Sequence, residues 1–295
     1  MTAIPTKLYE AFEKIRLGKV EEGTRLFDRV DGFDVIKAIP LAELCWFRHN
    51  WKQGMLFVQD FFMDDFKLWS GPSRISAYYG RRYTYAEQHL QLYLLATCVL
   101  DCWKESRVFL EEFKKRDQAT PAEIRKHCDI PKAISMVADP ENTKRSFLNA
   151  QPPKSRTEPI LRKYETKLDL SVFEGRIQSR KSIFDRKKKD KRYYDNLASD
   201  AFCRAITEVH ITFYEKYIDH LETDRAHLEA AMSYIALENL QEAKEAIRQY
   251  MRYWKFREPF QVAPIELFTY PELWMVMSDR RFTESLLTIP HHRES

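Results

Sequence analysis

Glycine is scarce in this chain, which disfavours the kinds of structure that depend on it. The 295 residues include only 7 glycines, and these never cluster. A glycine-rich phosphate-binding loop and a Gly-x-Ser-x-Gly nucleophile turn are both absent from the sequence. Residues that favour helix, such as Glu, Lys, Arg, Leu and Ala, are abundant. The composition therefore predicts an all-α protein.

Long apolar runs are also missing. The longest apolar stretch, Leu90 to Leu100, contains polar residues and is about half as long as a membrane span. The first twenty residues lack the apolar core and cleavage site of a secretory signal. The 5 cysteines are an odd number and are expected to be free thiols in a reducing compartment. These features predict a soluble, cytoplasmic protein with no membrane partner.

Metal-binding and thiol motifs are weak. Cys98 and Cys102 lie four residues apart, with His89 nearby, but no second pair of ligands has matching spacing. His127 and Cys128 are neighbours in sequence, and neighbouring side chains on a helix do not face each other. We therefore predict neither a metal site nor a cofactor.

The remaining histidines do not form a recognisable acid–base set. Glu208, His210 and Glu215 are expected on a solvated helix face. His220 and His227 flank a helix junction, where we expect capping or surface roles. No catalytic residue can be assigned, so the prediction is a protein that is not an enzyme.

The positive charge is concentrated in one segment. The chain as a whole has a net charge of +4. Residues 141–194 contain 16 Lys/Arg and 7 Asp/Glu. A basic patch within this segment is formed by Arg186, Lys187, Lys188, Lys189, Lys191 and Arg192. Three interpretations stay open: a solvated helix end, a surface that binds an acidic protein, or a nucleic-acid site with Tyr193 and Tyr194 as stacking partners.

A repeated pattern organises the chain. Residues 225–254 are predicted to form two antiparallel helices. The second helix has a large apolar residue at its start, a small residue three positions later, and apolar residues seven and ten positions later. The four copies are Val20, Gly23, Phe27 and Val30; Trp51, Gly54, Val58 and Phe61; Trp103, Ser106, Leu110 and Phe113; Leu240, Ala243, Ile247 and Tyr250.

This pattern resembles the helical hairpins of tetratricopeptide repeats. The small residue is expected where the two helices cross, and the apolar offsets place side chains on one face of the second helix. The turns before each copy are Gly18-Lys19, His49-Asn50, Asp101-Cys102 and Glu238-Asn239, residue types that suit left-handed or capping geometry. The usual first-helix glycine and closing proline are mostly absent, and the copies are unevenly spaced. The resemblance implies antiparallel hairpins stacked as a short, interrupted tetratricopeptide-like solenoid.

Composition shifts divide the chain into regions. We predict N-terminal hairpins over 1–137, in which a helix beginning at Thr120 ends before Pro131. A polar linker with four prolines is predicted over 138–160, and a C-terminal helical region over 161–295. The C-terminal region comprises the basic segment 176–194, the repeat 225–255 and a tail 259–295, in which Leu273, Trp274, Met277, Phe282 and Leu286 are expected to cap the last hydrophobic face.

The richest cluster of aromatic and arginine residues lies in residues 64–84, which interrupt the array of hairpins after the second copy. This segment contains a turn at Ser70-Gly71-Pro72. Its candidate partner-binding residues are Trp69, Arg74, Tyr78, Tyr79, Arg81, Arg82 and Tyr83. These residue types anchor many protein interfaces, although an ordinary loop packed on the hairpins would have the same composition.

A helical-repeat chain without catalytic motifs points to protein binding. Its general character resembles that of all-α bacterial immunity proteins, which bind and neutralise a cognate toxin. The resemblance implies a non-catalytic interaction scaffold whose partner is another protein. Alternatives are an adaptor or chaperone of a secretion system, a nucleic-acid-associated protein using residues 176–194, and an enzyme of unfamiliar class.

Overall fold

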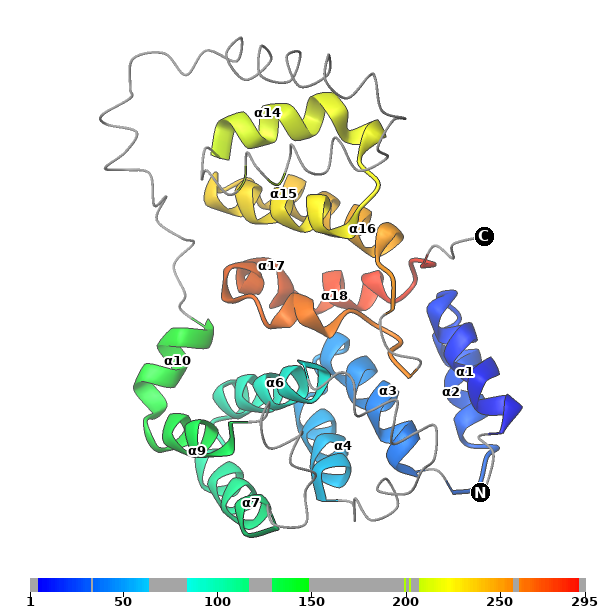
Figure 1. Ribbon diagram of the computed structural model, residues 1–295, viewed down its shortest axis with the longest axis vertical. Coiled ribbons are helices and arrows are strands. Elements are labelled where there is room, and N and C mark those ends of the chain that lie inside the picture. The colour runs from blue at the N-terminus through cyan, green and yellow to red at the C-terminus, as the bar shows by residue number, and fades with distance from the viewer. Residues whose placement is uncertain are drawn as a thin grey trace, which may run out of the picture. The chain divides into compact units, whose positions relative to one another are not determined.

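The computed structural model contains helices only, which confirms the predicted all-α class. It describes residues 5–32, 34–63, 84–116, 129–148, 207–256 and 260–291, together with Ser199 and Phe202. Within these ranges there are 13 α-helices, 3 short 3-10 helices and no strand (Figure 1). The chain divides into unit 1, Met1–Ala150 with Phe256–Pro290, and unit 2, Gln151–Lys255 with His291–Ser295.

The hairpins follow one another along the chain. In unit 1 the pairs are α1 (Thr6–Arg16) and α2 (Val20–Phe27), α3 (Asp34–Phe47) and α4 (Trp51–Met63), α6 (Thr84–Leu100) and α7 (Trp103–Arg116), and α9 (Ile130–Ala138) and α10 (Pro140–Leu148). Unit 2 contains α14 (Thr207–Tyr217), η3 (Ile218–His220), α15 (Asp224–Ala236) and α16 (Leu240–Tyr253). Helix α4 packs on α6, and α7 packs on α9. Each of the four sequence signatures thus begins the second helix of an antiparallel hairpin.

The four predicted turns share one backbone conformation. Each contains a left-handed residue: Gly18, His49, Asp101 and Glu238 have φ values of 77°, 53°, 55° and 60°. The N–H of the next residue donates to a carbonyl five positions earlier, over 2.9, 2.8, 3.3 and 2.8 Å respectively. This hydrogen bond satisfies a carbonyl at the end of the first helix, as in a Schellman motif. The same turn therefore reverses the chain in the four hairpins that carry the sequence signature.

The small residue lies where the helices of a hairpin approach most closely. A Cβ atom at Gly23 would lie 2.5 Å from Cγ1 of Ile15, and one at Gly54 would lie 2.6 Å from the ring of Trp46. Both distances are shorter than any van der Waals contact. Neither glycine has a positive φ, so backbone conformation does not require glycine at these two crossings. The lack of space for a Cβ atom does.

The other two crossings use serine and alanine. Ser106 and Ala243 are both fully buried. The Ser106 hydroxyl lies 2.8 Å from that of Thr97 on the facing helix, so its polar atom has a partner. In all four hairpins the N–H of the small residue donates to the carbonyl four positions earlier, over 3.0 to 3.1 Å. The position is thus defined by the backbone, and several small side chains can fill it.

The predicted linker is partly helical. Helix α10 occupies the first part of residues 138–160, and it packs against α9 and α6. Proline suits the first turn of a helix, and α10 begins at Pro140. The Thr143 hydroxyl donates to the carbonyl of Met136 over 2.6 Å, which joins α10 to α9. The later part of the predicted linker lies outside the described residues.

The predicted helix beginning at Thr120 falls mostly outside the described residues. Pro131 lies in the first turn of the next helix, α9, where a missing N–H costs nothing. The side chain of Asp129 caps this helix by accepting from the N–H of Lys132 over 2.9 Å.

The C-terminal tail belongs to unit 1 and not to the C-terminal region. It contains η4 (Ile265–Phe268), η5 (Pro271–Leu273), α17 (Trp274–Met277) and α18 (Arg280–Leu286). Helix α18 packs on α3, and η4 packs on α6 (Figure 1). Leu273, Met277 and Leu286 are completely buried. The tail therefore covers apolar surface of the N-terminal hairpins, which local sequence patterns do not reveal.

Two buried ionisable side chains hold this tail in place. Arg16 donates from Nε and Nη2 to the carbonyl of Gln261 over 2.9 and 2.8 Å. Oε2 of Glu43 accepts from the N–H groups of Val262 and Ala263 over 2.6 and 2.9 Å. Burial raises the pKa of the Glu43 carboxyl well above its ordinary value. These contacts satisfy backbone groups that would otherwise be buried without partners.

Aromatic rings complete the contact. Phe268 lies 5.1 Å from Phe47 and 5.8 Å from Trp51, measured between ring centroids. Trp51 also lies 6.1 Å from Trp274. Pairs at these separations add to the free energy of apolar burial. The second hairpin and the tail consequently share one core.

Candidate functional site

The two residue clusters predicted from sequence lie outside the described residues. The first is the partner-binding cluster Trp69, Arg74, Tyr78, Tyr79, Arg81, Arg82 and Tyr83. The second is the basic patch Arg186, Lys187, Lys188, Lys189, Lys191 and Arg192. Both stay predictions, and the described residues offer other candidates.

The first candidate is a cavity of about 420 Å³ in unit 1, which we call the polar pocket. It is bounded by α2, α3, the turn before α4 and the start of α18. Its lining residues are Thr24, Leu41, Leu44, Cys45, Arg48, His49, Asn50 and Arg280. The lining contains two arginines and no acidic residue. Sequence reasoning missed this site because Arg280 is 232 positions from Arg48 and no local pattern connects them.

Both arginines of the polar pocket have exposed partners. Nη2 of Arg48 lies 2.6 Å from the carboxylate of Glu21, which is 71% exposed. Nε of Arg280 lies 2.8 Å from the carboxylate of Glu284 in the same helix. The Arg48 side chain is 38% exposed and that of Arg280 is 67% exposed. Exposed ion pairs of this kind contribute about 0 to 1 kcal/mol, so the arginines remain available to another carboxylate.

His49 joins the two parts of the pocket. Its Nε2 lies 3.0 Å from the carbonyl oxygen of Met277 and 3.2 Å from the Thr283 hydroxyl. Since a carbonyl oxygen only accepts, Nε2 is the nitrogen that carries the proton. The ring also packs on Trp51, with 5.1 Å between centroids. Burial lowers the pKa of His49, so the ring is neutral near pH 7 and positions the site without adding charge.

Cys45 contributes a thiol to the pocket wall. Burial raises the pKa of Cys45 to about 11, and that of Cys98 to about 12. Both thiols are therefore protonated at neutral pH, whereas nucleophilic attack needs a thiolate. The Cys102 thiol lies 3.8 Å from the sulfur of Met55, in an environment that also raises its pKa. These three cysteines fit packing roles.

A second cavity, of about 580 Å³, lies between α4 and α7, and we call it the acidic pocket. Its lining residues are Gln59, Asp60, Met63, Lys104, Glu105, Val108, Phe109 and Glu112. Three carboxylates and one ammonium group give it a negative balance. Val108 is 65% exposed, so an apolar side chain lies at its rim. The acidic pocket and the polar pocket thus differ in charge.

Unit 2 contains a buried polar cluster that sequence reasoning placed at the surface. Nδ1 of His210 lies 2.9 Å from the hydroxyl of Ser233, and Nδ1 of His227 lies 2.8 Å from the hydroxyl of Tyr214. Both histidines are buried, at 0% and 1% exposure, so the predicted surface positions are wrong. Burial lowers the pKa of each to about 4. Helical spacing alone cannot distinguish a buried histidine from a solvated one.

Glu208 and Glu215, in contrast, are exposed as predicted. The carboxylate of Glu215 accepts a hydrogen bond from the hydroxyl of Tyr234 over 2.9 Å. The glutamates therefore do not join the buried histidines in an acid–base set.

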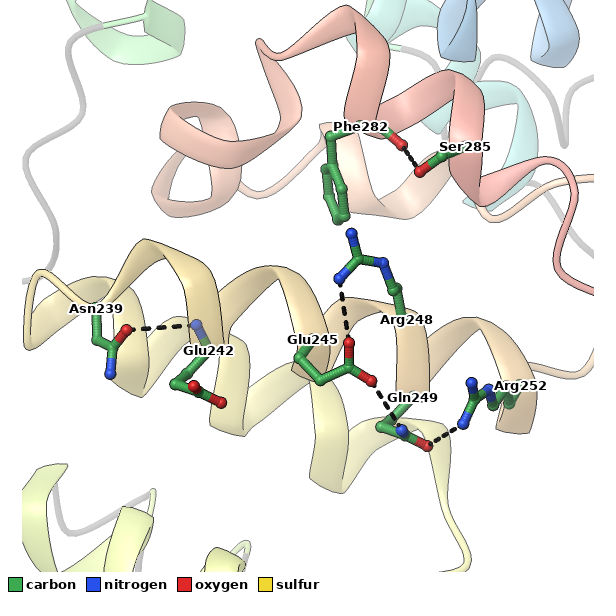
Figure 2. Close-up of polar contacts among 8 residues, drawn as sticks. All are labelled: Asn239, Glu242, Glu245, Arg248, Gln249, Arg252, Phe282 and Ser285. Carbon is green, nitrogen blue, oxygen red and sulfur yellow. Dashed lines mark hydrogen bonds and ion pairs between the residues drawn. The ribbon is translucent and has the colours of Figure 1, made fainter.

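Polar side chains form a row of contacts along α16 (Figure 2). Asn239 caps the helix by accepting from the N–H of Glu242 over 3.3 Å. Side-chain hydrogen bonds link Glu245 to Arg248 and Gln249, and Gln249 to Arg252, over 3.1 to 3.3 Å. Contacts at three- and four-residue spacing stabilise a helix.

Across the part of the chain that the structure describes, no three His, Cys, Asp or Glu side chains gather closely enough to hold a metal ion. The helices of these same ranges include none with the length and apolar character needed to cross a membrane.

Comparison with protein-family models, with curated proteins and with solved structures found no match. The similarity to tetratricopeptide hairpins and to immunity proteins therefore stays a prediction from sequence. The polar pocket and the repeated hairpins are the features from which function can be argued.

Proposed function

We propose that this chain is a non-catalytic protein-binding scaffold that neutralises a cognate bacterial toxin by binding it. The observation that carries this proposal is the hairpin turn repeated four times, at Gly18, His49, Asp101 and Glu238. Stacked helical hairpins present side chains from successive repeats on a continuous surface, which is how such proteins bind their partners.

The packing of unit 1 supports a role in binding. Helices α4 and α6, and then α7 and α9, connect successive hairpins side by side. Two cavities open on this array, and they carry opposite charge balance. Surfaces with separate charged regions orient a partner and exclude wrong ones.

The environments of the titratable groups support a non-catalytic role. His210 and His227 are enclosed in unit 2, where a substrate has no access. The thiol of Cys45, which does line a cavity, is kept protonated by burial. A general base or nucleophile needs both access and a pKa near the working pH.

A tagged pull-down from the native host tests the proposal. The protein is isolated at moderate salt, with and without nuclease treatment, and its partners are identified by mass spectrometry. We expect one stoichiometric protein that survives nuclease and is toxic when expressed alone. Recovery of many partners that disappear after nuclease treatment would instead favour nucleic-acid association.

The nucleic-acid alternative is motivated by the excess of 16 basic over 7 acidic residues in 141–194. Its test is charge reversal of Arg186, Lys187, Lys188 and Lys189. If binding depends on this patch, the variant loses affinity and the steep salt dependence that phosphate contacts produce. Unchanged binding by this variant would rule the alternative out. An adaptor or chaperone would capture a partner that is not toxic alone.

A further inference from the structure

We infer that the polar pocket receives an acidic side chain, glutamate or aspartate, from the protein partner. This inference rests on the proposed protein-binding function and assigns it a site. The polar pocket is the cavity of about 420 Å³ that contains Arg48 and Arg280 and has no acidic lining residue.

The first argument is the supply of hydrogen-bond donors. A guanidinium group has five N–H donors in a planar fork that matches a carboxylate. Arg48 uses Nη2 for Glu21, and Arg280 uses Nε for Glu284. Apart from these ion pairs, the described residues give neither guanidinium another hydrogen-bond partner. Each arginine can therefore donate to a second carboxylate while it keeps its ion pair with the first.

The second argument is the arrangement of polar and apolar walls. Thr24 and Asn50 add neutral polar groups beside the arginines, while Leu41 and Leu44 add an apolar wall. A glutamate has a short apolar stem and a charged end, so both kinds of wall have a counterpart on it. The volume admits one or two side chains and no folded domain, so the pocket is one contact within a larger interface.

The third argument is rigidity. His49 binds the carbonyl oxygen of Met277 and touches the Thr283 hydroxyl, so the turn after α3 and the start of α18 are held together. Arg48 directly precedes His49, and Arg280 lies between Met277 and Thr283 in sequence. A site whose backbone is anchored before binding loses less entropy when a partner arrives.

The acidic pocket provides the contrast. It has three carboxylates against Lys104 and would repel the same side chain. Only the polar pocket, of the two cavities, fits a partner of negative charge.

The test uses the protein partner captured in the pull-down, and variants R48E, R280E and R48E/R280E of the full chain. The matched control is R107E, because Arg107 forms an ion pair with Glu111 over 2.8 Å and is 58% exposed, much as Arg280 is with Glu284. Circular dichroism and thermal unfolding establish that each variant folds. Dissociation constants are then measured over a range of salt concentrations.

We expect each single substitution in the polar pocket to weaken binding about 10-fold, the double substitution about 100-fold, and R107E less than about 2-fold. A photo-crosslinking residue in place of Thr24 then identifies the partner segment that enters the polar pocket. Changing the acidic residue of that segment to lysine should restore binding to R48E/R280E. Equal affinity of R48E/R280E and the unsubstituted protein would overturn the inference while leaving the protein-binding function intact. Failure to capture any protein partner would overturn the proposed function itself.

A further experiment distinguishes a carboxylate of the protein partner from a free anion as the occupant of the polar pocket. Inorganic phosphate is titrated against the unsubstituted protein and R48E/R280E by calorimetry. Phosphate binding that needs both arginines, with partner affinity unchanged in R48E/R280E, would show an anion site and overturn the inference.

Discussion

Lowering the pH from about 7.5 to about 5.5 is expected to destabilise unit 2 by about 2.7 kcal/mol, through two buried histidines. His210 and His227 are neutral in the folded state because burial lowers the pKa of each from 6.5 to about 4. In the unfolded chain the same rings take up protons as the pH falls below their ordinary pKa. The unfolded state then binds more protons than the folded state, so acid favours unfolding.

The magnitude follows from the two pKa values. Stability from each histidine is fully present above pH 6.5 and is lost progressively as the pH falls toward 4. Over the chosen window each histidine contributes a loss of about 1.35 kcal/mol, and the window ends before the folded-state rings protonate. That loss is a large fraction of the stability of a typical domain.

The assay must report unit 2 alone. Burial raises the pKa of Glu43 in unit 1, which acts in the opposite direction, because protonation of a buried carboxyl favours the folded state. The protein is therefore equilibrated in urea at each of the two pH values and then labelled in a short amide-exchange pulse at one fixed pH. Mass spectrometry of peptides from α15 and α16 then gives the fraction of unit 2 that is unfolded.

The double variant H210N/H227N isolates the cause. Asparagine can replace the hydrogen bond made by Nδ1 and does not titrate, so the loss between the two pH values should nearly disappear. H220N is the control, because His220 is exposed, and it should keep the full loss. A loss below about 0.5 kcal/mol in the unsubstituted protein, or an undiminished loss in H210N/H227N, would refute the reasoning.

Two further predictions concern packing in unit 1. G54A should destabilise the protein by about 1 to 3 kcal/mol in urea unfolding, because the new Cβ would lie 2.6 Å from the ring of Trp46. Glycine-to-alanine changes in ordinary helix interiors stabilise a protein by about 1 kcal/mol. A G54A variant that is more stable than the unsubstituted protein would therefore contradict the close helix crossing at this position. E43A should cost about 2 to 5 kcal/mol, because it leaves the buried N–H groups of Val262 and Ala263 without their acceptor. E43Q should lose less than half of that, because both N–H groups reach a single oxygen of Glu43 that an amide oxygen can replace; equal losses in E43A and E43Q would contradict this.

The four hairpins could be predicted because their physical causes are local. A crossing of two helices needs a small side chain, and the chain reversal needs a residue that tolerates positive φ. Both requirements fall within a few residues of the hinge, so Gly18 and Gly23 reveal a hairpin without any tertiary information.

Two further helices depart from the sequence pattern at the hinge. The pattern has a large apolar residue there, whereas Pro140 and Arg280 begin α10 and α18. Both helices nevertheless have a buried small residue three positions later, at Thr143 and Thr283. The small residue is the more informative part of the signature, because the crossing depends on it and the hinge residue can vary.

The polar pocket and the docking of the tail could not be predicted, because their contacts are distant in sequence. Glu43 accepts from Val262 across 219 positions, and His49 meets Met277 across 228. Neither pair is marked by periodicity, and a glutamate in an apolar helix such as α3 gives no sign of its partner.

The shared turn explains how one backbone can carry different binding chemistry. Its hydrogen bonds join main-chain atoms, so they hold the turn whatever the side chains are. The residues before and within the turn are Leu17-Gly18, Arg48-His49, Leu100-Asp101 and Leu237-Glu238, of which only the second pair is basic. The polar pocket forms at that second turn, where the tail brings Arg280 beside it. The backbone of this turn is shared with other hairpins, and a distant segment supplies the second arginine. The acidic contact that we propose at this turn should therefore contribute to the choice of partner.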